Sequence, residues 1–319
     1  MRRLNYQRKD LGYSFALTTA VMVAVALVLS FIFGAETSGW KFWVMQALYT
    51  VLIGGSAFLY ATVSKTNFVA ATKLNAKPSL WHTLWGCGAV VFLVFGMNQI
   101  NMLFLDLIEK IGLTRPSVYL ENNLAGLIIC ACILPAFAEE IVFRGTVAQS
   151  LYDSKNKLAA LAVSGALFSI FHANPAQTLH QFVLGAFLTL LVFRSGSLWT
   201  SVIVHFFNNA FVVAMAYTPL GADEFWNLST NTKWALPLMI VGIVGFALCV
   251  FGYVKTTKSS WQTSAEVSVD ETGEKTSDGA DEETKNKADF KANTQKSSNA
   301  TLIVALFVCA VLWVAQLLL

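Results

Sequence analysis

Residues 124–144 read L-A-G-L-I-I-C-A-C-I-L-P-A-F-A-E-E-I-V-F-R, an apolar run that ends in two adjacent glutamates and an arginine. Apart from Glu139 and Glu140, no acidic residue falls within the long hydrophobic segments predicted below. A carboxylate in hydrocarbon costs roughly 2.5–3.5 kcal/mol near a helix centre, so it normally faces a protein interior or a watery cavity. The two glutamates therefore indicate a functional site inside a membrane protein.

The composition of the whole chain also indicates an integral membrane protein. The 319 residues are 55% hydrophobic and 13% charged, with a mean hydropathy of +0.58, whereas a soluble domain is about 25% charged. A net charge of +3 without a basic stripe predicts no nucleic-acid partner. The five cysteines lie in apolar runs and lack the spacing of a zinc site or a disulfide framework.

Nine apolar segments are candidates for transmembrane helices, which need about 20 residues to cross a bilayer. We predict an all-α polytopic transmembrane bundle with about eight core spans and one C-terminal span. The fifth and sixth candidates are short, and Pro175 between them disfavours a continuous helix, so they are predicted to be broken or re-entrant. The candidates are 14–34, 40–63, 84–104, 124–143, 158–171, 179–193, 198–216, 235–254 and 301–319.

Charge distribution predicts the orientation and the domain boundaries. Lys and Arg cluster at the N-terminus and in every second loop, so the N-terminus is predicted to be cytoplasmic and an odd number of spans puts the C-terminus outside. Residues 255–299 hold 16 of the 41 charged residues and predict a disordered polar linker. The expected units are N-terminal helices at 1–123, a helical core at 124–254, this linker, and a C-terminal helix at 300–319.

Three polar pairs four residues apart lie in separate apolar segments: Glu140 with Arg144, Phe168 with His172, and His205 with Asn209. Residues four apart share a helix face, so Glu140 and Arg144 can form an ion pair. Glu139 points about 100° away. One glutamate can therefore be neutralised while the other faces a cavity.

These side chains supply a base, two imidazoles and an amide. A carboxylate can take a proton from water, and histidine can orient that water, move its proton or ligate a metal. A histidine and an asparagine amide can donate hydrogen bonds to an oxyanion. Together they predict attack of water on an amide bond, and no serine or cysteine with a neighbouring base indicates covalent catalysis. His180 joins this site only if the connecting loop folds back.

Other interpretations of the same residues stay open. Glu140 and Arg144 can be a structural ion pair, and intramembrane histidines often only hydrogen-bond between helices. A non-catalytic binding, immunity or scaffold protein could hold a peptide with the same groups. Intramembrane Glu and His also occur in transporters and proton relays, although the chain lacks the two repeated halves typical of transporters.

The ordered set E-E-I-V-F-R at 139–144, F-S-I-F-H at 168–172 and H-F-F-N-N at 205–209 resembles three motifs of one family. That family is the CPBP family, also named Abi or CAAX protease and bacteriocin-processing family, with motifs E-E-x-x-x-R, F-x-x-x-H and H-x-x-x-N or -D. It includes the type II CaaX prenyl endopeptidases. The resemblance covers about residues 124–215.

The resemblance implies an all-helical intramembrane protease that hydrolyses a membrane-associated protein or peptide. It implies that Glu139 is catalytic with His172 as its partner in activating water, and that His205 and Asn209 stabilise the oxyanion. By the same resemblance Glu140 and Arg144 support the site and Phe168 packs rather than reacts. The polar linker and the C-terminal helix depart from the simplest family plan, which makes them accessories.

Metal use and substrate are not fixed by the sequence. Glu139, His172 and His205 could hold a divalent metal such as zinc with water in an open position. The chain contains no H-E-x-x-H pair, which favours metal-free chemistry. The partners expected are the lipid bilayer and a membrane-bound protein or peptide substrate, whether prenylated or not.

Overall fold

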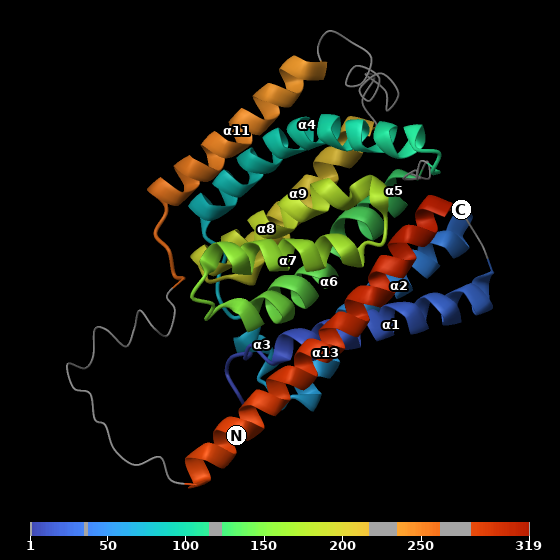
Figure 1. The fold of residues 1–319 in the computed structure, drawn as a ribbon. Coiled ribbons are helices and arrows are strands. Elements are labelled where there is room, and N and C mark those ends of the chain that lie inside the picture. Colours follow the sequence, from blue (N-terminus) through green and yellow to red (C-terminus); the bar gives the residue numbers. More distant parts are fainter. Residues whose placement is uncertain (1, 35–37, 115–122, 217–234, 262–281, 319) are drawn as a thin grey trace.

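The computed structural model describes residues 2–34, 38–114, 123–216, 235–261 and 282–318. Within these residues the chain is helical, with one isolated bridge between Arg3 and Thr66 and no strand. The helices form the expected all-α bundle (Figure 1). They are α1 (Asp10–Phe33), α2 (Gly39–Val63), α3 (Phe68–Ala71), α4 (Leu80–Lys110), α5 (Leu124–Leu127), α6 (Leu134–Val142), α7 (Lys157–Phe171), α8 (Thr178–Ser195), α9 (Leu198–Ala216), α11 (Ala235–Thr256) and α13 (Glu282–Leu318).

Eight helical segments of the described chain are long and apolar enough to cross a membrane, which corrects the expected nine. The segment that falls short is α7, whose 15 residues extend for about 22 Å against a hydrocarbon core of about 30 Å. The expected interruption before α8 is confirmed, since a 3₁₀ turn (Pro175–Gln177) separates the two helices. Hydrophobicity could not distinguish the short helix, because a half-span has the same composition as a full one.

Helices α7 and α8 form an antiparallel pair. The hydroxyls of Ser169 and Ser164 bond Thr178 O and Thr189 Oγ1 at 2.7 and 2.8 Å, so the two helices run in opposite directions. The start of α7 and the end of α8 therefore lie at the same end of the bundle. Helix α9 therefore begins at the end of the bundle where α7 began, although α7 is short.

Helix α13 packs against α1 and crosses it in Figure 1, and the two helices run in the same general direction. At the start of α1, Ser298 Oγ from the interior of α13 donates to Lys9 O at 2.5 Å. Further along, Thr19 Oγ1 lies 3.8 Å from Cys309 Sγ. Because α13 follows α1 in the same direction, Arg3 and Leu318 lie at opposite ends of the bundle.

The segment predicted as a linker differs from the structure at both ends. Helix α11 continues to Thr256, and Trp261 is buried with its indole N–H donating to Tyr152 O at 2.9 Å. Helix α13 begins at Glu282, well before residue 300. A helix extends readily once it is nucleated, and the Lys- and Glu-rich residues before the apolar part are good helix formers. Residues 262–281 lie outside the described residues.

Helix α4 also continues past its expected end at residue 104 to Lys110. It therefore carries Asp106 and Glu109 close to its C-terminal end. Their neighbours Leu105 and Ile108 pack in one cluster with Leu317 of α13, so this part of α4 lies at the end of the bundle opposite to Lys9.

A π-helical segment flanks α6 on each side, which sets the direction of its two glutamates. Residues Ile128–Ile133 precede α6 and Phe143–Val147 follow it in this wider helix. Pro135, in the first turn of α6, has no N–H to donate to the carbonyl four residues earlier and disfavours a regular α-helix there. Single π turns are frequent at functional sites because they redirect neighbouring side chains.

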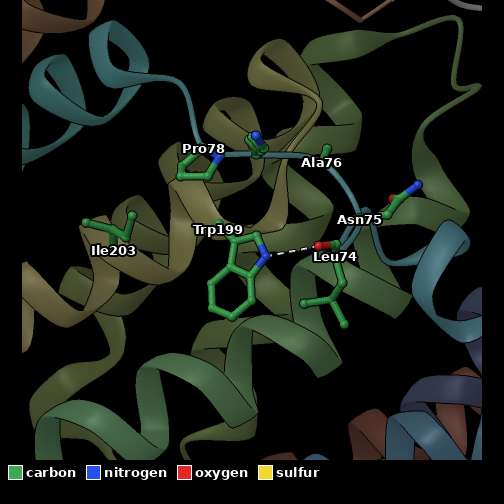
Figure 2. Close-up of a pocket in the computed structure, with 7 residues that line it drawn as sticks. Leu74, Asn75, Ala76, Pro78, Trp199 and Ile203 are labelled. Atoms are coloured by element: carbon green, nitrogen blue, oxygen red, sulfur yellow. Dashed lines mark hydrogen bonds between the residues drawn. The ribbon is translucent and has the colours of Figure 1, made fainter.

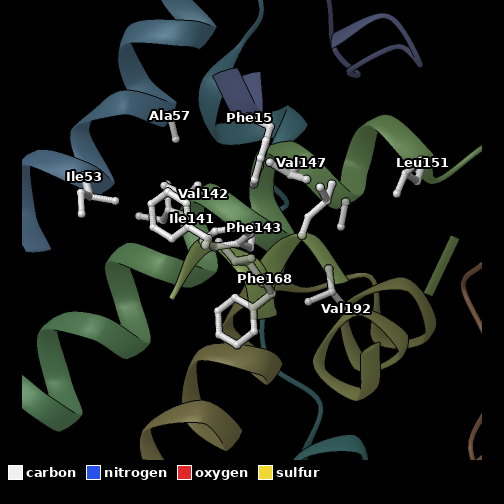
Figure 3. Close-up of a cluster of buried hydrophobic side chains, with 14 of the residues drawn as sticks. Phe15, Ile53, Ala57, Ile141, Val142, Phe143, Val147, Leu151, Phe168 and Val192 are labelled. Atoms are coloured by element: carbon white, nitrogen blue, oxygen red, sulfur yellow. The ribbon is translucent and has the colours of Figure 1, made fainter. Parts of the chain in front are cut away.

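Buried aromatic side chains hold α7 against α6 and its continuation (Figure 3). The ring of Phe143 packs edge-on against Phe168 at 5.0 Å and against Phe171 at 5.1 Å between centroids. Such pairs contribute about 0.5–1.5 kcal/mol each beyond the area they bury. They fix the C-terminal end of α7, and His172 follows directly.

Candidate active site

Three of the predicted site residues converge from three helices. Glu139 lies on α6, His172 directly follows α7, and His205 lies about 10 Å into α9 from its first residue. Glu139 Oε2 is 3.8 Å from His172 Nε2 and 3.9 Å from His205 Nε2. These separations are too long for direct hydrogen bonds and suit groups that share one water molecule.

The second nitrogen of each imidazole fixes the direction of the ring. His172 Nδ1 donates to Phe168 O at 2.7 Å, and His205 Nδ1 donates to Glu140 Oε1 at 2.9 Å. A carbonyl or carboxylate oxygen can only accept, so both Nδ1 atoms carry a proton. In a neutral ring Nε2 is then a lone-pair acceptor, and in the charged ring it is a donor. In either state both Nε2 atoms face Glu139.

Glu140 and Arg144 form the predicted ion pair at the base of the site. Arg144 Nη1 lies 2.7 Å from Glu140 Oε1, and both side chains are fully buried. Arg144 Nη2 also donates to Gly185 O on α8 at 3.2 Å. Glu140 Oε1 therefore accepts from an arginine and from His205. The contact with His205 spans 65 residues, and no spacing in the sequence could have predicted it.

Phe168 packs among the charged groups, as the resemblance implied. Its ring lies under the Arg144 guanidinium, with 4.0 Å between Cζ and the ring centroid. The imidazoles of His172 and His205 meet it edge-on at 4.7 and 5.9 Å between centroids. The fully buried ring excludes water from the ion pair and restricts both histidines.

Asn209 lies one turn beyond His205 on the same face of α9, and two hydrogen bonds fix its amide. Its Nδ2 donates to Ala131 O, and its Oδ1 accepts from Asn208 Nδ2, both at 3.1 Å. The residue four positions after Ala131 is Pro135, which has no N–H for that carbonyl. One N–H of the Asn209 amide remains for a ligand. Asn208, which points away in a helical projection, is thus a buried support for Asn209.

Two residues outside the predicted set interact with Glu139, His172 and His205. His180 interacts electrostatically with His172 and His205. The loop after α7 therefore folds back, which was the condition for His180 to lie near this site. Tyr49 on α2 interacts in the same way with Glu139. No sequence pattern indicates Tyr49, since an isolated aromatic in an apolar segment is typical of packing.

The predicted metal ligands do not form a metal site in the described part of the chain. A tetrahedral zinc ion with ligands at about 2.0–2.1 Å needs donor atoms roughly 3.4 Å apart. The separations of Glu139 Oε2 from the two imidazoles are wider, and no group of three His, Cys, Asp or Glu side chains could hold an ion there. The chemistry below is therefore derived for the protein's own groups.

An open pocket of about 200 Å³ lies beside the first turn of α9 and contains none of the predicted site residues (Figure 2). The loop before α4 forms one wall, fixed where Trp199 Nε1 donates to Leu74 O at 3.0 Å. The other wall is α9 itself, through Trp199 and Ile203. The Trp199 ring also lies 5.7 Å from that of Phe137, two residues before Glu139. The pocket thus adjoins the side of the site between α6 and α9.

Comparison with known proteins identifies a family model and a curated relative. Residues 121–211 match the family model described as type II CAAX prenyl endopeptidase Rce1-like. A Bacillus subtilis (strain 168) protein named "Putative membrane peptidase YdiL" is 27% identical over 136 residues. That alignment covers 42% of this chain and spans half the length of the relative. The matched region contains all seven predicted site residues.

Proposed function

We propose that the chain is an intramembrane endopeptidase, on the premise that residues 121–211 match the family model of type II CAAX prenyl endopeptidase Rce1-like proteins. It hydrolyses a peptide bond in a membrane-associated protein or peptide by means of water. The observation that carries the proposal is the approach of two imidazole Nε2 atoms to a single carboxylate oxygen of Glu139, at 3.8 and 3.9 Å. The comparisons do not favour the alternative of a non-catalytic binding or immunity protein.

In the first step Glu139 and His172 act on the same water. The water donates one hydrogen to Glu139 Oε2 and the other to His172 Nε2, which leaves its oxygen lone pairs directed at the substrate. As that oxygen bonds to the carbonyl carbon, Glu139 takes the proton. The carbonyl π electrons move to oxygen and give a tetrahedral oxyanion.

His205 and Asn209 stabilise this oxyanion. Asn209 offers the amide N–H that is not bonded to Ala131, and His205 offers Nε2–H in its imidazolium form. The Glu140 carboxylate at Nδ1 stabilises that charge. Two carboxylates balanced by one guanidinium leave a net negative charge, so a charged His205 also makes the cluster neutral. Preorganised donors of this kind contribute several kcal/mol to such reactions.

In the last step the carbon–nitrogen bond breaks. The oxyanion re-forms the carbonyl, and Glu139 returns its proton to the leaving amine nitrogen. The products are one new carboxylic acid and one new amine, and the site regains its starting protonation. Glu139 therefore acts first as the general base and then as the general acid.

The experiment uses purified full-length protein in liposomes with internally quenched peptides that end in Cys-aliphatic-aliphatic-X, with and without a farnesyl group. Glu139→Gln, His172→Ala and His205→Ala should each abolish cleavage. The unfolding midpoint of Glu139→Gln should stay near that of the wild type, whereas His205→Ala also loses the buried bond to Glu140 Oε1 and should unfold earlier. Trp81→Phe, at a 69% exposed position, is the control and should cleave normally. Cleavage retained in all three site variants would refute the mechanism, and preference for the farnesylated probe would assign the substrate class.

A further inference from the structure

The C-terminal helix α13 lies outside the family match at 121–211, yet it contacts the loop that follows His172. Trp313 Nε1 donates to Thr178 Oγ1 at 2.7 Å. Leu317 of α13 and Ala176 of the loop are buried in one apolar cluster, and Trp313 packs against it. The last turn of α13 is held there by Thr114, whose N–H donates to Leu317 O at 3.0 Å.

The bond from Trp313 also determines what the Thr178 hydroxyl does with its own proton. An indole N–H can only donate, so Thr178 Oγ1 is the acceptor in this contact. The hydroxyl hydrogen is then directed to Asn174 O, which lies 3.1 Å away. Asn174 in turn accepts from Ala176 N at 2.9 Å through its side chain. A continuous set of hydrogen bonds therefore runs from α13 into the loop two residues after His172.

The loop needs such support because its backbone is strained beside the catalytic histidine. Ala173 adopts a left-handed conformation with φ of 47°, which is uncommon for a residue with a side chain. Such conformations persist when the surroundings over-determine them. The surroundings here are Ser169, which donates to Thr178 O, Asn101 of α4, which donates to Ala176 O, and Trp313 of α13.

We propose that Trp313 is a positioning residue for His172, so that the appended C-terminal helix is a working part of the active site. It acts through Thr178 and the 173–178 loop and touches no reacting atom. The inference rests on the proposed peptidase function for its kinetic test. It also has a physical test that is independent of activity.

The kinetic test changes the two ends of one hydrogen bond. Trp313→Phe removes the donor and keeps a smaller aromatic ring, and Thr178→Val removes the hydroxyl at nearly constant volume. Each should lower kcat about 2- to 12-fold, the range that one net hydrogen bond supplies, with KM within twofold. Thr178→Ser keeps the hydroxyl and should retain wild-type kcat. The double variant should fall no further than the worse single variant.

The physical test measures hydrogen exchange of the amides in residues 172–178. Exchange should accelerate in Trp313→Phe and Thr178→Val, and stay as in the wild type in Thr178→Ser and in the exposed control Trp81→Phe. If Trp313→Phe does not fold, the Thr178 pair decides the question alone. Unchanged exchange and kcat in the first two variants would overturn the inference, and so would equal losses in Thr178→Val and Thr178→Ser.

The two proposals fail in distinguishable ways. If the wild-type protein cleaves no probe, the proposed peptidase function fails, and the exchange pattern alone decides whether α13 positions the loop. If the wild type cleaves and the Trp313 and Thr178 variants behave as additive, independent losses, the peptidase function stands and the positioning role of Trp313 is refuted.

Discussion

Replacement of Glu140 by glutamine separates the structural role of the buried ion pair from its role in catalysis. The amide has the size of the carboxylate but no charge. It leaves Arg144 buried without its counter-ion, and it removes the acceptor that fixes the His205 ring. Without the carboxylate at Nδ1, the imidazolium form of His205 that donates Nε2–H to the oxyanion loses its counter-charge.

The structure sets the expected magnitudes. Glu140 Oε1 accepts charge-assisted bonds of 2.7 Å from Arg144 and 2.9 Å from His205, each contributing about 1.5–3 kcal/mol. The free energy of unfolding should therefore fall by about 3–5 kcal/mol, as when one partner of a buried pair is removed. Cleavage should fall by roughly 10³–10⁴-fold, as when an imidazole loses the carboxylate that sets its tautomer.

A second change tells the two effects apart. Glu140→Gln with Arg144→Met replaces the ion pair by two neutral side chains, so the double variant should recover part of the lost stability. It should not recover cleavage, because His205 Nδ1 still meets an amide. Unfolding by SDS in dodecyl maltoside micelles and cleavage of the quenched peptide measure the two quantities. Lys255→Met, at an exposed position, is the control and should change stability by less than about 0.5 kcal/mol.

The reasoning would be refuted by either of two results. One is a Glu140→Gln protein that unfolds within about 1 kcal/mol of the wild type, since a fully buried Arg144 cannot lose its partner at so small a cost. The other is recovery of cleavage in the double variant, which would show that the carboxylate serves only to neutralise the arginine.

Three further outcomes test other parts of the site. Asn209→Ala should lower kcat by roughly 10²–10³-fold with little change in KM, measured with the same peptide, because it removes one oxyanion donor; a rise in KM alone would contradict that role. Gly165→Ala should destabilise the protein by about 1–3 kcal/mol in SDS unfolding, because its Cβ would lie 2.5 Å from Phe182 O on α8. Gly55→Ala, with open space around it, should not destabilise it. Dialysis against EDTA should leave the cleavage rate unchanged; a loss that zinc restores would instead require a metal held by Glu139, His172 and His205.

The helical class and the identity of the polar residues could be predicted from local sequence. A carboxylate pair in an apolar run is costly in lipid, so Glu139 and Glu140 indicated a site without any structure. Spacing of four residues put Arg144 beside Glu140, because helix periodicity alone decides that contact. The local pattern also marked the segment of α7 as short, although it was still counted among the candidate spans. It failed for the start of α13, which lies within a polar segment.

The sequence by itself therefore determined which groups are charged or basic and which neighbours share a helix face. Only the tertiary structure decided that His205 bonds Glu140, that Asn209 donates to Ala131 O, and that Trp313 reaches the loop after His172. Those contacts join residues 65 or more positions apart. Their distances depend on how whole helices pack, and packing is a property of all the buried surfaces together rather than of any one segment.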